Sequence, residues 1–188
     1  RGLVGSEMCI RDSSSMNTTV EVGADVEKAT LTTFLHEQRA AVLAIVDGMD
    51  EVAMRTPVVP SGWSPIGLIW HLGGAEMYWF QIVLAGRMPD DDGADEAEDD
   101  GTDEGFRTDE PVAEVLAAYR AQCIESDEVL ASVSLDDAPR GPVVPEHTEL
   151  ATSVRTIVLH MIEETARHAG HLDIARELLD GRTGLGPR

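Results

Sequence analysis

The chain has 188 residues, of which 43% are hydrophobic, and its formal net charge is -21. This length predicts one domain that is large enough to bury an apolar core. A surface this acidic repels nucleic-acid phosphates and anionic lipids, which argues against nucleic-acid and membrane partners. No run of 18 apolar residues exists, so we expect no membrane span. The two cysteines, Cys9 and Cys123, are too few for a disulfide framework and favour a reducing, cytoplasmic location.

Residues 1–15 differ in character from the rest of the chain. They read RGLVGSEMCIRDSSS, with no cationic segment followed by an apolar one, so they are not a signal peptide. The segment resembles translated sequencing-adapter sequence, and we interpret it as a non-native or disordered tail. Residues 16–188 are then expected to form a single helical domain that starts at Met16.

Four segments carry apolar residues at helical spacing: 25–49, 65–86, 108–133 and 151–180. Residues 52–62, which contain two prolines, are expected to form a loop. No internal repeat and no convincing strand pattern is present. Four long amphipathic helices predict an all-α fold, an antiparallel four-helix bundle.

The ends of these helices carry recognisable signals. Ser64 can cap the second helix and Pro65 suits its first position, while Gly181 follows the last helix as a C-terminal cap. Cys123 falls on the apolar face of the third helix, so we expect it to be buried and inert.

Residues 90–104 read DDDGADEAEDDGTDE. Like charges at this density have no apolar partners to pack against, which predicts a solvated acidic loop. A calcium site is the alternative, but the glycine and the closing glutamate do not have EF-hand spacing.

One stripe of the last helix gathers several potential ligands. With His160 at zero and about 100° per residue, Glu164 falls at about 40°, His168 at about 80° and His171 at about 20°. The neighbouring Glu163 points away, at about 300°. A carboxylate and an imidazole one turn apart can bind the same metal ion.

The second helix places His71 within the apolar run LIWHLGGA. Such a histidine is either a satisfied core residue or a ligand. Several imidazoles and a carboxylate on one stripe would be costly to bury without a partner, and a divalent cation is a suitable one. We therefore predict a metal site between the two helices, in which His71 and donors from the stripe of the last helix hold one divalent ion. Two imidazoles, one carboxylate and an open position suit zinc, with nickel, iron or manganese as alternatives.

Two stretches carry a family resemblance: GWSPIGLIWHLGGAEMYWF and HMIEETARHAGHLDIARELLDG. With them the chain resembles the DinB-like superfamily over nearly all of residues 25–181, and within it the thiol-dependent branch that includes mycothiol-dependent maleylpyruvate isomerase. The resemblance implies a DinB-like helical bundle with His71, Glu164 and His168 as metal ligands. It also implies that His171 is an outer or substrate-facing residue and that His160 lines the same cavity.

The resemblance further implies a metal-dependent S-transferase, in which the metal activates a small thiol, suspected to be mycothiol, for attack on an electrophile. A metal-activated water acting in hydrolysis is one alternative, and a non-enzymatic, metal-binding stress protein is another. The sequence leaves the electrophile and the oligomeric state open, and a homodimer is compatible with it.

Polar and aromatic residues near the expected site allow two interpretations each. Arg167 and Glu76 either orient substrate or belong to the surface. Trp70, Tyr78 and Trp79 either wall a substrate cavity or belong to the core, and we favour the core.

Overall fold

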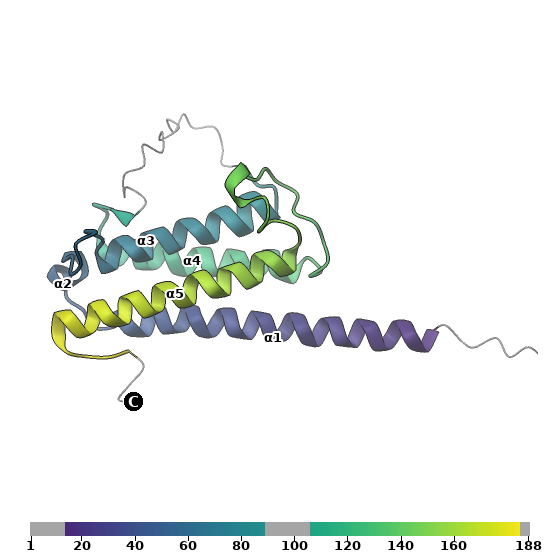
Figure 1. Cartoon of the computed structure of the whole chain (residues 1–188), viewed down its shortest axis with the longest axis horizontal. Helices are drawn as coiled ribbons and strands as arrows, with labels where there is room; N and C mark the ends of the chain where they lie inside the picture. The colour runs from purple at the N-terminus through teal and green to yellow at the C-terminus, as the bar shows by residue number, and fades with distance from the viewer. Residues whose placement is uncertain (1–13, 89–105, 185–188) are drawn as a thin grey trace, which may run out of the picture.

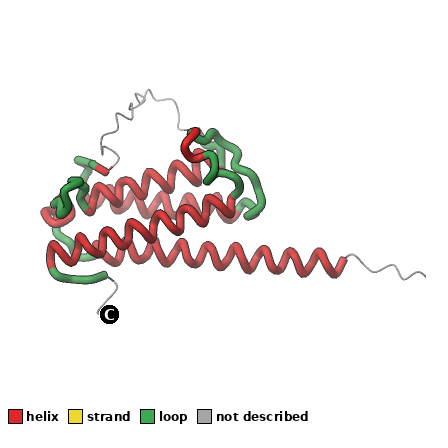
Figure 2. Tube along the Cα trace, in the orientation of Figure 1, coloured by secondary structure: helices red, strands yellow, loops and turns green. Residues whose placement is uncertain are grey.

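The computed structural model of the protein describes residues 14–88 and 106–184, and every regular element in these ranges is a helix (Figure 2). The predicted all-α class is therefore confirmed. Most of the predicted tail and the whole acidic loop at 90–104 lie outside the described residues. Within the described ranges no helix is long and apolar enough to cross a membrane.

Helix α1 spans Ser14–Val46, so it begins well before the expected residue 25, and its first turns extend beyond the other helices (Figure 1). Gly48 follows its last residue, Val46, after one intervening position, and its φ of 67° suits a residue without a side chain. The expected loop at 52–62 begins instead with a short helix, α2, at Glu51–Arg55. The Asp50 carboxylate caps α2 by accepting a hydrogen bond from the amide of Ala53 at 2.8 Å.

Helix α3 spans Pro65–Glu76, and the Ser64 hydroxyl accepts a hydrogen bond from the amide of Gly67, as predicted. The expected helix does continue to Leu84, but its second half, Met77–Leu84, is a π-helix, η1. The last π-helix carbonyls find partners outside the helix: the amide of Gly141 donates to Val83 O at 2.9 Å. Tertiary hydrogen bonds thus support the wider turn.

Helix α4 spans Val112–Ala131, the short 3-10 helix η3 spans Pro145–His147, and α5 spans Val154–Asp180. A capping box starts α5, in which the Ser153 hydroxyl accepts from the Thr156 amide and the Thr156 hydroxyl accepts from the Ser153 amide. Gly181, with φ 76°, ends α5 as expected.

Helices α1 and α5 run side by side in the same direction (Figure 1). Arg155, at the start of α5, pairs with Glu27, midway along α1, at 2.8 Å. Near the ends of both helices the Arg176 guanidinium donates to the carbonyl of Ile45 at 2.7 Å. The predicted antiparallel arrangement is therefore wrong for this pair. A long connection, such as residues 85–111 between η1 and α4, permits such a topology.

Helices α3 and η1 run antiparallel to α5. His71 of α3 meets Glu164 of α5, whereas Trp79, two turns later, meets His160, one turn earlier. This opposed order brings the two stretches that carry the family resemblance into contact. The finer assignment to a DinB-like four-helix bundle stays a prediction.

The core combines apolar packing with one buried ion pair. The Arg39 guanidinium donates two hydrogen bonds to the Glu76 carboxylate, at 2.7 and 2.6 Å, and a third to Asp127 at 2.7 Å. Glu76 is only 1% exposed, so it belongs neither to the surface nor to a substrate site. Apolar side chains from all the long helices pack in two clusters, which include Leu35, Val42, Ile69, Leu72, Phe80, Val115, Ile157, Met161 and Leu172.

Candidate metal centre

The facing sides of α3 and α5 bring the three predicted donors together. Nε2 of His71 lies 3.1 Å from Oε1 of Glu164, and Nε2 of His168 lies 2.9 Å from the same oxygen. Burial of Met161, Ala169 and Leu172 fixes the rotation of α5, so that the ligand stripe beside them meets α3.

The ligand atoms of His71, Glu164 and His168 all lie within 4.8 Å of one another. Metal–nitrogen and metal–oxygen bonds are about 2.0–2.2 Å long, so one cation can reach all three donors with small side-chain adjustments. Two neutral imidazoles and one carboxylate suit zinc and its neighbours. The residues present therefore fit a divalent ion.

The electrostatics of the site favour an ionised carboxylate. Hydrogen bonds from His168 and then from His71 hold the pKa of Glu164 well below its usual range, and they outweigh the opposing effect of burial. Glu164 therefore offers a negative charge at neutral pH. A cation placed between the imidazoles would meet its only anionic ligand there.

His171 lies behind His168 rather than among the converging donors. The Nδ1 atoms of the two rings are 3.4 Å apart, which leaves Nε2 of His168 directed at Glu164. Partial burial and the charge of His168 lower the pKa of His171, so its ring is neutral near pH 7 and can accept a hydrogen bond. The outer or substrate-facing role expected for His171 stays a prediction.

Arg167 lies at the rim and interacts with both neighbouring carboxylates. It donates to Glu163, and its Nη1 lies 3.6 Å from Oε2 of Glu164, the oxygen that faces away from the two imidazoles. The Arg167 side chain is 54% exposed. Arg167 can therefore hold Glu164 in place and still face an anionic group in solvent.

His160, one turn before Glu164, is not one of the converging donors. Its ring packs edge-on against Trp79, with ring centroids 4.9 Å apart. The ring of His147 packs against the same indole, with centroids 5.1 Å apart. Burial lowers the pKa of His160, which keeps the ring neutral. The structure thus places His160 beside the donor cluster, with a second histidine that the sequence reasoning missed.

Two aromatic side chains at the site were also missed. Phe106 stacks on His71 with ring centroids 4.2 Å apart and an interplanar angle of 21°. Trp63 packs near His171 at 6.0 Å. Trp63 precedes the second predicted helix directly and could have been suspected, but nothing in the sequence around Phe106 points to His71.

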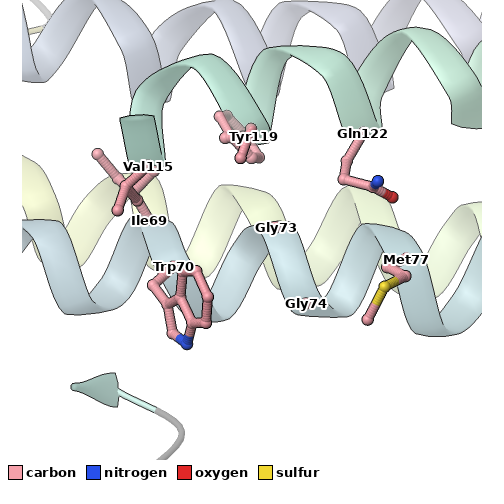
Figure 3. A pocket seen from close by; sticks show the side chains of 9 residues that line it. Ile69, Trp70, Gly73, Gly74, Met77, Val115, Tyr119 and Gln122 are labelled. Atoms are coloured by element: carbon pink, nitrogen blue, oxygen red, sulfur yellow. The ribbon is translucent and has the colours of Figure 1, made fainter. Parts of the chain in front are cut away.

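A separate apolar groove of about 400 Å³ lies between α3 and α4 (Figure 3). None of the three donor residues lines it; its walls are Ile69, Trp70, Gly73, Gly74, Met77, Val115, Ala118, Tyr119 and Gln122. Trp70, expected in the core, is 44% exposed here, whereas the core prediction for Trp79 is confirmed.

Cys123 is half-buried rather than buried. Burial and then the charge of Glu76 raise the pKa of its thiol to about 12. A thiol with this pKa carries almost no thiolate at neutral pH, which agrees with the expected inertness.

A family model described as mycothiol-S-transferase matches residues 30–181. The chain belongs to this family. It is one of the families of the DinB-like superfamily, so the resemblance to the thiol-dependent branch is confirmed. No curated protein and no solved structure gives a significant match.

Proposed function

We propose that this protein is a metal-dependent S-transferase that joins mycothiol to an electrophilic small molecule. The observation that carries the proposal is the convergence of His71, Glu164 and His168 on one point, in a chain of the mycothiol-S-transferase family. These three residues would hold one divalent ion, zinc first, with nickel, iron or manganese as alternatives. A DinB-like four-helix bundle and a cytoplasmic location, where small thiols stay reduced, belong to the same proposal.

When bound, the cation supplies Lewis acidity that stabilises a thiolate over a thiol at neutral pH. The chain's own residues prepare the site for this. Glu164 contributes the single negative charge and leaves the centre with a net positive charge that attracts a thiolate. His171 and Arg167 hold His168 and Glu164 in their orientations, as outer partners commonly do.

The proposed reaction forms one sulfur–carbon bond. The thiol releases its proton to solvent, the sulfur attacks the electrophilic carbon, and the leaving group departs with the bonding electrons. His160 is only partly buried and Arg167 is exposed, and both lie within about one turn of Glu164 on α5. We assign them and His171 to contacts with the thiol or the electrophile. The neutral His160 ring suits a hydrogen bond to a polar group of substrate.

The test combines metal loading with thiol choice. The full chain, stripped of metal and then reloaded with zinc, is incubated with an alkyl halide probe and with mycothiol, bacillithiol or glutathione, and the conjugate is measured by mass spectrometry. We expect conjugate above the uncatalysed rate only with zinc and mycothiol together. His71→Ala should abolish it, and Glu163→Gln should not.

Other outcomes would point to the alternatives. Zinc-dependent cleavage of an ester probe without any thiol would replace the proposal with a hydrolase. Zinc binding without turnover of any probe would replace it with a non-enzymatic metal-binding protein.

A further inference from the structure

Gly67, in the first turn of α3, is the point where a distant segment meets this helix. A Cβ atom at this position would lie 1.8 Å from the carbonyl oxygen of Phe106 and 2.7 Å from its carbonyl carbon. These are backbone atoms, which cannot rotate away as a side chain would. Residue 67 must therefore lack a side chain if Phe106 is to lie where it does.

The same helix offers a contrasting glycine. A Cβ atom at Gly74 would have nothing within 4 Å of it. Glycine is less favourable than alanine inside a helix, so a glycine there calls for a local reason. The close approach of Phe106 provides that reason at Gly67 and not at Gly74.

A second anchor fixes the segment that follows Phe106. The Arg55 guanidinium, at the end of α2, donates to the carbonyl of Thr108 at 3.1 Å and to that of Glu110 at 2.6 Å. The segment is thus held between α2 and α3, and its position near the donors does not depend on Phe106 alone.

The Phe106 ring touches both candidate histidine ligands. It stacks on His71. Its ring centroid also lies 5.8 Å from that of His168, with an interplanar angle of 57°. The χ2 torsion of histidine has broad minima, so an imidazole needs a partner to hold it at one angle. His168 has such a partner in His171. Among residues 14–88 and 106–184, no hydrogen bond reaches Nδ1 of His71. The stacked ring of Phe106 is therefore the partner that holds the His71 ring at one angle.

We propose that Phe106, seated against Gly67, is a positioning residue of the metal centre that holds the His71 ring with Nε2 directed at Glu164 and His168. The proposal rests on the metal-dependent function proposed above. An apolar stacking contact here fixes the orientation of the ring, which hydrogen bonds usually do for metal-bound histidines. The ring also keeps water from one face of His71, which strengthens the electrostatic attraction at the site.

The test measures metal binding rather than turnover. Zinc affinity of the full chain and of the variants Phe106→Leu and Gly67→Ala is determined by competition with a chromogenic chelator, and folding is checked by circular dichroism. Losing an outer partner of a ligand typically weakens binding about 10–100-fold, and we expect that loss for both variants. Gly74→Ala, the matched control in the same helix, should bind zinc like the unmodified chain.

The visible spectrum of the cobalt-loaded protein reports ligand geometry directly. Phe106→Leu and Gly67→Ala should shift its bands, whereas Gly74→Ala should not. Phe106→Tyr should have the same cobalt spectrum and zinc affinity as the unmodified chain, because it keeps a flat ring on His71.

Specific results would overturn the inference. If Phe106→Leu is folded and matches the unmodified chain in zinc affinity and in cobalt spectrum, Phe106 does not position His71, and the proposed function stands. If the unmodified chain binds no zinc, the metal-dependent function fails and the inference fails with it. Should Gly67→Ala not fold, Phe106→Leu alone decides.

Discussion

Glu163 and Glu164 are adjacent in the chain, yet the side chain of Glu163 is 67% exposed and that of Glu164 only 14%. Glu163 pairs with Arg167 in solvent, whereas Glu164 accepts hydrogen bonds from two imidazoles. The two glutamates thus provide an internal control, because they differ in position around α5 and in little else.

Glu164→Gln should weaken zinc binding by more than about 100-fold, since an amide is a poor neutral ligand and its loss exceeds that of an outer partner. Glu163→Gln should leave affinity unchanged, because an exposed ion pair contributes little. Chelator competition on the purified variants measures both. Equal weakening by the two substitutions would mean that the assigned register of α5 is wrong.

His168→Ala should remove zinc binding almost completely, because it deletes a proposed ligand. His171→Ala removes only the group that meets Nδ1 of His168, so we expect a milder loss of about tenfold. The same titration compares these two His-to-Ala changes, which lie within one turn of α5. If His171→Ala abolishes binding and His168→Ala does not, the ligand assignment is wrong although a site exists.

Most of the donor set could be predicted because it depends on local geometry. The 100° step places Glu164 and His168 on one stripe of α5 together with His160 and His171. The family resemblance then singles out Glu164 and His168 as the ligand pair. His71 required one further assumption, that the two amphipathic helices meet on their histidine-bearing faces. The structure brings all three together as expected.

What could not be predicted depends on contacts between distant residues. Phe106 reaches His71 only because Gly67 permits a backbone approach from a segment almost 40 residues away. The Arg39–Glu76 pair joins two helices, and no sequence pattern distinguishes Glu76 from an ordinary exposed glutamate. The π-helix that follows Glu76 depends on partners from the loop at Gly141.

Cys123 should resist alkylation at alkaline pH while the protein is folded. An unfolded thiol has a pKa of about 8.5, whereas burial raises that of Cys123 to about 12. Between these values the unfolded state loses the proton first, so folding stability falls as pH rises through this window. At pH 9 we expect iodoacetamide to react at least about 100-fold more slowly with native protein than with protein in urea. Mass spectrometry of the peptide containing Cys123 measures the rates, and equal rates would contradict the burial of its sulfur.

The Arg39–Glu76 pair should matter for folding and not for metal binding. Glu76→Gln leaves the Arg39 guanidinium, which is 5% exposed, without its main counter-charge, and breaking a buried pair costs about 3–5 kcal/mol. Glu51→Gln is the matched control, because the Glu51–Arg55 pair is exposed and 62% of the Glu51 side chain is accessible. This substitution should lower the free energy of unfolding by less than about 1 kcal/mol. Urea denaturation of the two variants measures the difference, and zinc titration of the folded proteins should give unchanged affinity for both.

A Glu76→Gln variant that keeps its stability would show that Asp127, 2.7 Å from Arg39, is a sufficient counter-charge. A Glu76→Gln variant that is folded but has lost zinc would instead connect this pair to the metal centre, five residues from His71 on the same helix.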